Sequence, residues 1–345
     1  MVTTLARGRL ADRPFGVTEF DFCYPNDRRA EGWVPFAAYA RLQGWSFATA
    51  FAYNAESWDN REAAYGLAGK ISSVWRFHND PAGFGQWPLT ALIFLRGDVQ
   101  PARKTVDIGF TDTDTFAPEP GRFPPDSVGF VGDLPLVHRT RQVYGDRFSG
   151  VPSGRSSAAI RKSAVAKAAS LLSPLKDGWR VSDTGELHYR AESGTFVIDT
   201  PRTQGIVGFT DMTPIALRAV TLTPASSFGS VVLTSLDGLP IARSRRMLLT
   251  AVGRCQNTGF TLTPVPGVPE RFQMNQSSAG AAPILIDPLH LALRFPHESD
   301  SRRLTVFALD GAGNRISALS VRRESGAAVV TITGNPATIY YELVR

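Results

Sequence analysis

The chain has 345 residues, enough for two or three domains and a sizeable core, and its 43% hydrophobic and 20% charged residues are typical of a globular protein. Its net charge of +6 comes from scattered basic residues without a recognised nucleic-acid-binding motif, so we expect no nucleic-acid partner. No apolar run is long enough for a signal peptide or a membrane span, so we expect no membrane association.

The first hundred residues predict alternating strands and helices. Short β-branched and aromatic runs predict strands, while apolar residues at helical spacing predict helices, the last of which ends at a glycine. The predicted order is strand 15–20, helix 33–42, strand 45–53 and helix 85–97. This part therefore reads as two consecutive β/α units.

After residue 100 the pattern changes. Loops rich in proline and glycine cover residues 116–136, and a basic helix is expected over 156–172. From Trp179 onward, short strands alternate with turns to the end of the chain, which favours one or two β-sandwich domains. The predicted division is 1–100, 101–280 and 281–345.

The candidate catalytic residue is Glu19. It lies at the carboxyl end of the first predicted strand, where (β/α) barrels place their catalytic groups. Glycoside hydrolysis needs two carboxyl groups around the scissile bond, and in retaining enzymes one of them is a nucleophile. Glu19 fits that role; the alternative is a surface glutamate at the end of an ordinary strand, beside aromatic residues that only pack.

Further residues could bind a sugar. Tyr24, Tyr53 and Trp58 follow strand ends and are candidate platforms for stacking on sugar faces, while Asn26 and Glu31 could hydrogen-bond sugar hydroxyls. The expected partner is a polysaccharide or oligosaccharide substrate. The five histidines show no metal-ligand spacing, and glycoside hydrolysis requires no metal or organic cofactor, so none is expected.

Several segments together resemble a known family. Phe-Gly-Val-Thr-Glu-Phe at 15–20, Ala-Ala-Tyr-Ala-Arg-Leu-Gln-Gly-Trp at 37–45 and the strand-like run 47–53 resemble strand seven, its helix and strand eight of (β/α)8-barrel glycoside hydrolases of the cellulase-like clan. Residues 87–99 look like the closing helix. Downstream, 181–187, 196–205 and 248–259 are similar to the β-sandwich that follows the barrel in large bacterial members.

The resemblance implies an α/β plus all-β protein in which the last two β/α units of a barrel precede β-sandwich modules. It implies a retaining, polysaccharide-directed glycosidase, truncated at its N-terminus, with Glu19 as nucleophile. The acid/base glutamate of the family belongs at the end of strand four, and no segment of this sequence corresponds to that strand. Two β/α units cannot close a barrel, so we expect their open edges to pack against the β-sandwich or to mediate self-association.

Two other functions stay open. The chain could be a non-catalytic carbohydrate-binding or interaction module, or a serine esterase without a recognisable motif. Its two cysteines, Cys23 and Cys255, are far apart in sequence and are expected to be buried free thiols.

Overall fold

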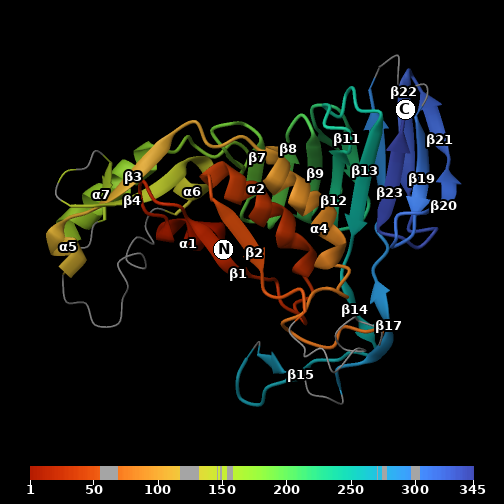
Figure 1. Ribbon diagram of the computed structural model, residues 1–345, viewed down its shortest axis with the longest axis horizontal. Helices are drawn as coiled ribbons and strands as arrows, with labels where there is room; N and C mark the ends of the chain where they lie inside the picture. The colour runs from red at the N-terminus through yellow and green to blue at the C-terminus, as the bar shows by residue number, and fades with distance from the viewer. Residues whose placement is uncertain are drawn as a thin grey trace. The chain divides into compact units, whose positions relative to one another are not determined.

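A computed structural model describes residues 1–54, 69–116, 132–145, 147, 150–153, 158–269, 271–273, 278–296 and 304–345 (Figure 1). Its contacts define unit 1, made of Met1–Thr18, Phe36–Thr49 and Ile93–Ile198, and unit 2, made of Glu19–Pro35, Ala50–Leu92 and Asp199–Arg345. Helices are few and strands many, so the predicted mixed, sheet-rich class is confirmed. Among the described residues no helix has the length and apolar character needed to cross a bilayer.

The first elements follow the predicted order, although the predicted strand 45–53 is observed only over residues 47–50. Strand β1 (Gly16–Phe20) is followed by helix α2 (Trp33–Gln43) and strand β2 (Phe47–Ala50), and the two strands form a two-stranded sheet. The Ser46 amide donates to the Phe15 carbonyl and the Phe51 amide to the Phe20 carbonyl. Residue numbers rise in the same direction along both strands, so the strands are parallel. Only Pro35 and Arg41 of α2 are partly exposed, which explains why its apolar residues are not confined to one stripe.

A composite helical segment fills the predicted helix 85–97. It consists of a 3-10 turn η3 (Phe84–Gln86), helix α4 (Trp87–Ala91) and a π-helical segment η4 (Leu92–Gly97). It ends at Gly97, whose φ of +71° is a left-handed conformation that glycine adopts without strain.

Unit 1 contains a small parallel sheet that the sequence analysis did not predict. Strand β3 (Thr105–Phe110) lies between β4 (Arg139–Tyr144) and β5 (Val151–Pro152), and both neighbours are parallel to it. Helix α7 (Ala158–Ser170), within the predicted helix 156–172, buries Ala164 and Ala168 against this sheet. The other elements are α1 (Val2–Leu5), η1 (Ala6–Gly8), α5 (Asp112–Phe116), α6 (Leu134–Val137), and β6 (Arg180–Val181), β7 (Leu187–Arg190) and β8 (Thr195–Asp199), which pair antiparallel.

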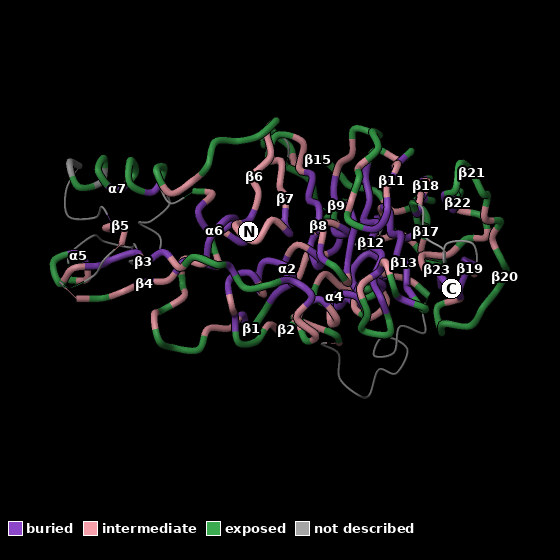
Figure 2. The backbone as a smooth tube through the Cα atoms, turned by 90° about the horizontal axis from the view of Figure 1, so that it is seen from above, coloured by how far each residue is buried: buried purple, intermediate pink, exposed green. Residues whose placement is uncertain are grey.

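Unit 2 is built on antiparallel sheets that lie as two rows in Figure 2. One row has the order β10 (Ile215–Ala216), β11 (Thr221–Pro224), β18 (Leu291–Phe295), β22 (Ala327–Ile332), β21 (Val321–Glu324). The other has the order β20 (Arg315–Leu319), β19 (Thr305–Leu309), β23 (Tyr340–Val344), β13 (Arg246–Val252), β12 (Phe228–Ser235), β9 (Thr203–Phe209). Two further ribbons pair β14 (Cys255–Thr258) with β17 (Ala281–Ile286), and β15 (Thr263–Pro264) with β16 (Phe272–Gln273).

The centre of unit 2 lies at β12. All eight residues of this strand are buried, because one face of its sheet packs against the row that contains β11 and β18, and η3 and the 3-10 turn η2 (Arg29–Glu31) cover the other face. Ser230 of β12 donates to Gln86 Oε1 at 2.7 Å, which ties η3 to the sheet. In β9, a Cβ atom at Gly205 would lie 2.4 Å from the Val231 carbonyl oxygen, so only glycine allows this close approach of the two strands.

Candidate functional site

Glu19 is placed by strand β1. It is the fourth of the five strand residues and is exposed, whereas the following Phe20 is buried. The Phe20 carbonyl accepts a hydrogen bond of 3.0 Å from the Phe51 amide, just beyond the end of β2. The Glu19 carboxylate therefore lies in solvent at the carboxyl end of β1, and the chain that leaves β2 runs beside it.

Four exposed aromatic side chains follow β2. We call Phe51, Tyr53, Trp75 and Phe84 the aromatic surface; their exposed fractions are 40%, 58%, 53% and 37%. Ring centroids are 6.1 Å apart for Phe51 and Trp75 and 5.4 Å apart for Tyr53 and Phe84. Such open rings beside a carboxylate can stack on the apolar faces of a ligand while leaving its polar groups accessible.

The backbone fixes the aromatic surface. The Ala52 amide donates to the Trp75 carbonyl at 2.7 Å, and the Phe77 amide donates to the Ala52 carbonyl at 3.2 Å, so residues 75–77 lie alongside the chain that leaves β2. His78 Nδ1 lies 2.9 Å from the Tyr53 carbonyl, which can only accept, so this nitrogen carries a proton. Burial lowers the pKa of His78, which favours the neutral ring with this single N–H.

Asp21 lies two residues after Glu19 and has a strongly perturbed carboxyl group. Burial, with repulsion from Asp80, raises the pKa of Asp21 to about 7, against the opposing effects of the Phe22 amide and Arg29. The Phe22 amide donates to Asp21 Oδ1 at 2.7 Å. Near neutral pH this side chain can therefore either hold or release a proton, as a general acid or base must.

The turn after β1 is anchored by a buried ion pair. Arg29 Nε donates to Asp80 Oδ2 at 2.5 Å and Nη2 to Oδ1 at 3.0 Å, and the two side chains are 1% and 4% exposed. Nη1 donates to the Asn26 carbonyl and Nη2 to the Cys255 carbonyl, at 2.7 and 2.9 Å. Burial alone would lower the pKa of Arg29, but the charge and hydrogen bonds of Asp80 raise it above its ordinary value.

Cys255 completes this group of buried side chains. Its thiol donates to Asp80 Oδ1 at 3.1 Å, and burial together with the negative charge of Asp80 raises the pKa of the thiol well above its ordinary value. Cys23 is also a free thiol and is partly exposed, so its expected full burial is not observed. Arg29, Asp80 and Cys255, the Arg29 cluster, thus join three distant parts of unit 2.

The other predicted substrate-binding residues have different surroundings. Tyr24 is 4% exposed and packs under the Arg29 guanidinium at 5.0 Å and against Phe260 at 5.3 Å, so its ring belongs to the core. Asn26 is exposed, and its side-chain oxygen accepts from the Arg28 amide at 3.0 Å. Glu31 is partly buried, which raises the pKa of its carboxyl group. Trp58 lies outside the described residues.

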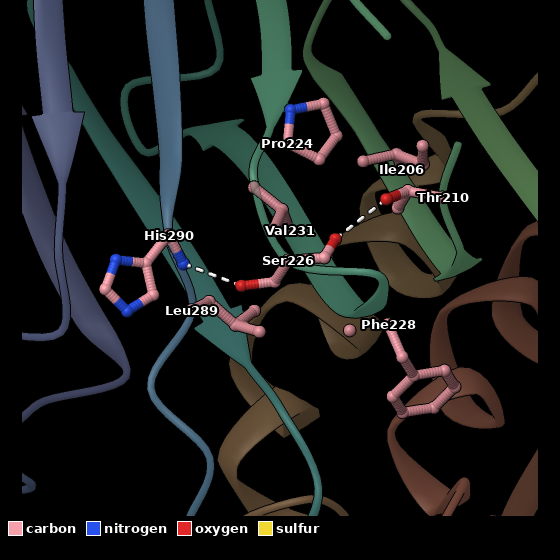
Figure 3. Close-up of a pocket in the computed structure, with 9 residues that line it drawn as sticks. Ile206, Thr210, Pro224, Ser226, Phe228, Val231, Leu289 and His290 are labelled. Atoms are coloured by element: carbon pink, nitrogen blue, oxygen red, sulfur yellow. Dashed lines mark hydrogen bonds between the residues drawn. The ribbon is translucent and has the colours of Figure 1, made fainter. Parts of the chain in front are cut away.

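A small apolar hollow lies between the two rows of strands in unit 2 (Figure 3). Ser226 and His290 both line it, yet Ser226 Oγ accepts from the His290 backbone amide at 2.9 Å, and the imidazole points away from the hydroxyl. A serine nucleophile needs a base within hydrogen-bonding reach of its oxygen. This pair therefore offers no support for the serine-esterase alternative.

Neither a metal-binding group of side chains nor a known relative identifies the role of the candidate site. Within the described ranges, no three histidine, cysteine, aspartate or glutamate side chains gather as a metal site. No family model, no curated protein and no solved structure matches the chain. The candidate site therefore rests on Glu19, Asp21 and the aromatic surface.

The sequence analysis named Glu19 and Tyr53 and missed Asp21, Phe51, Trp75 and Phe84. Asp21 was within reach of the same reasoning, because it follows Glu19 with a single apolar residue between them. Trp75 and Phe84 follow a polar stretch of the sequence and only the pairing of residues 75–77 with residue 52 brings them to β2. No local sequence pattern predicts that pairing.

Proposed function

We propose that the chain acts on carbohydrate as a retaining, polysaccharide-directed glycoside hydrolase, with Glu19 as the nucleophile and β1–α2–β2 as part of a (β/α) barrel. One observation carries the proposal: an exposed carboxylate at the carboxyl end of β1 lies on the strand next to an open aromatic surface. The parallel β1–α2–β2 order supports it, because catalytic groups of such barrels lie at this end of the strands. The resemblance to cellulase-like glycosidases points the same way.

The proposed chemistry is a double displacement. A Glu19 oxygen bonds to the anomeric carbon while the glycosidic C–O bond breaks, and a protonated carboxyl group gives its proton to the leaving oxygen. Water then attacks the glycosyl–enzyme ester, loses a proton to that same carboxylate and frees Glu19. Asp21, with its pKa near 7, and Glu31, with its raised pKa, are the described carboxyl groups near Glu19 in sequence that favour their protonated form more than usual.

The experiment compares activated and natural substrates. A dinitrophenyl glycoside needs no proton for its leaving group, so a chain with the nucleophile but a weak acid should cleave it far faster than a polysaccharide, and azide should accelerate turnover. Glu19→Gln should lower both activities by orders of magnitude, while the exposed control Glu192→Gln should change neither. Activity of Glu19→Gln within a few-fold of the unmodified chain would refute the nucleophile.

A second candidate function, polysaccharide binding without hydrolysis, is favoured by the aromatic surface itself. The exposed Tyr53 and Trp75 rings offer stacking area whether or not bonds are cleaved. Pull-down on insoluble glucan, mannan and xylan separates the two: binding that is lost in Trp75→Ala, with no turnover of any activated glycoside, would support the binding module. Absence of both binding and turnover would contradict both functions.

A further inference from the structure

The small parallel sheet of unit 1 has one apolar face and one charged face. Helix α7 packs on the face that carries Val106, Ile108 and Phe110 of β3 (Figure 2). Successive residues of a strand point to opposite faces, so Thr105 and Asp107 lie on the other face. That other face is polar, although the sheet belongs to the core of unit 1.

Residues 9–11 extend this sheet beside β4. The Gln142 amide donates to the Arg9 carbonyl at 2.7 Å, and the Ala11 amide donates to the Gln142 carbonyl at 2.8 Å. Leu10 and Gln142 form a parallel bridge. Arg9, one residue earlier, therefore lies beside Arg141 and on the same face of the sheet.

Three guanidinium groups gather on this polar face, which we call the arginine face: those of Arg9, Arg139 and Arg141. The strand register places Arg139 opposite Thr105 and Arg141 opposite Asp107. Arg141 has two carboxylate partners, because its Nε donates to Asp107 Oδ1 at 2.6 Å and its Nη1 to Asp12 Oδ1 at 3.2 Å. Arg139 Nε instead donates to the neutral hydroxyl of Thr105 at 2.9 Å.

Arg9 and Arg139 lack a carboxylate of their own. Among the described residues neither makes an ion pair, and Arg9 Nε and Nη1 are buried without a hydrogen-bond partner. Burial and the positive charges of Arg139 and Arg141 lower the pKa of Arg9, whereas the carboxylate of Asp12 raises it. Unmet buried donors cost free energy, and like charges this close repel one another. The arginine face therefore carries more positive charge than its two carboxylates balance.

We propose that the arginine face binds a small oxyanion, which is the carboxylate of an acidic sugar or the phosphate of a phosphorylated compound. A planar guanidinium donates two parallel N–H bonds to either group. An oxyanion between Arg9 and Arg139 supplies acceptors for the unmet donors and offsets the repulsion between the two cations. Arg141 is already held by Asp107 and Asp12, so Arg9 and Arg139 are the ligand-binding residues. The site is independent of Glu19 and the aromatic surface.

The test is isothermal titration calorimetry of the full chain with inorganic phosphate and with glucuronate, and with neutral glucose as the uncharged control. Phosphate, glucuronate or both should bind with millimolar or higher affinity, and glucose should bind more weakly than glucuronate. Binding of phosphate alone assigns the phosphorylated compound, and binding of glucuronate alone assigns the acidic sugar. Failure of both anions to bind, or equal binding of glucose and glucuronate, would overturn the proposal.

Two variants remove the proposed ligand-binding residues. Arg9→Gln and Arg139→Gln should each weaken anion binding at least about tenfold, the loss expected for one charge-assisted hydrogen bond. Circular dichroism and melting profiles show whether each variant folds. Asp12→Asn removes a competing carboxylate whose side chain is 88% exposed, so the fold should survive and anion binding should strengthen about two- to fivefold.

The matched control is Arg322→Gln, which removes one positive charge from unit 2 at a side chain that is 65% exposed. This variant should bind the anion like the unmodified chain. An equal loss of binding in Arg322→Gln would overturn the proposal and assign the binding to net charge. Unchanged binding in a folded Arg9→Gln or Arg139→Gln variant would also overturn it, as would binding by Asp12→Asn no tighter than that of the unmodified chain.

Discussion

Replacing Asp80 with asparagine tests the Arg29 cluster directly. The two charged side chains are almost fully buried, and asparagine keeps the shape of aspartate while removing its charge. The Arg29 guanidinium would then stay buried without a compensating charge. Breaking a buried ion pair by removing one partner costs about 3–5 kcal/mol, whereas an exposed pair contributes at most about 1 kcal/mol. We therefore expect Asp80→Asn to lower the free energy of unfolding by about 3–5 kcal/mol.

Urea denaturation followed by tryptophan fluorescence measures this loss, since Trp33 and Trp75 lie in unit 2. The matched control is Glu324→Gln, which breaks the Arg322–Glu324 pair at 3.4 Å, with side chains 65% and 46% exposed. The double variant Arg29→Met with Asp80→Leu removes both charges and should be more stable than Asp80→Asn alone. A loss below about 1 kcal/mol in Asp80→Asn would refute the reasoning, as would a double variant less stable than Asp80→Asn.

Two other perturbations have signs fixed by the structure. The pKa of Asp21 is raised from its ordinary value of 3.8 to about 7 in the folded chain. The folded chain therefore binds this proton more tightly than the unfolded chain does. The resulting contribution to stability is complete below pH 3.8 and is lost as the pH rises through 7. Asp21→Asn should thus raise the free energy of unfolding at pH 8 by about 1–2 kcal/mol, allowing for solvent screening of a partly exposed group, and change it little at pH 4; parallel stability curves from pH 4 to 8 would contradict this. Gly205→Ala should lower the melting temperature through a loss of about 1–3 kcal/mol, because its Cβ meets the Val231 carbonyl, whereas Gly311→Ala, with no atom within 4 Å of the new carbon, should be neutral in the same calorimetric comparison.

Local sequence patterns predicted much of the fold. The β-branched run before Glu19 predicted β1, and the short strand-like runs separated by turns after Trp179 predicted the strand-rich remainder of the chain. The parallel sheet around β3 was missed. The first four of the six residues of strand β4 are polar, and β5 spans only Val151–Pro152, so neither strand has an apolar run that would predict it.

The candidate site was predicted only where its residues are neighbours in sequence. Glu19 precedes a turn rich in polar residues, and Tyr53 follows a strand, so both could be recognised locally. Arg29 meets Asp80 across 51 positions and Cys255 across 226, and such contacts depend on how distant segments pack. Tyr24 was predicted to bind substrate, but its ring is buried in the core. A tyrosine in a turn has the same sequence pattern whether its ring faces solvent or the core, so the sequence could not distinguish the two.

The segmented make-up of unit 2 limits how this protein can be divided in the laboratory. The chain passes between the two units five times, at residues 18–19, 35–36, 49–50, 92–93 and 198–199, so no single cut releases either unit as one continuous polypeptide. A fragment that starts at Asp199 retains Cys255 but lacks Arg29 and Asp80, and its thiol would lose both of its charged neighbours. Expression should therefore use residues 1–345 together, because a form that starts at residue 19 would cut strand β1 (Gly16–Phe20) and remove part of unit 1. Inserting a tag or label at the exposed turn 311–313 is safer than separating the units.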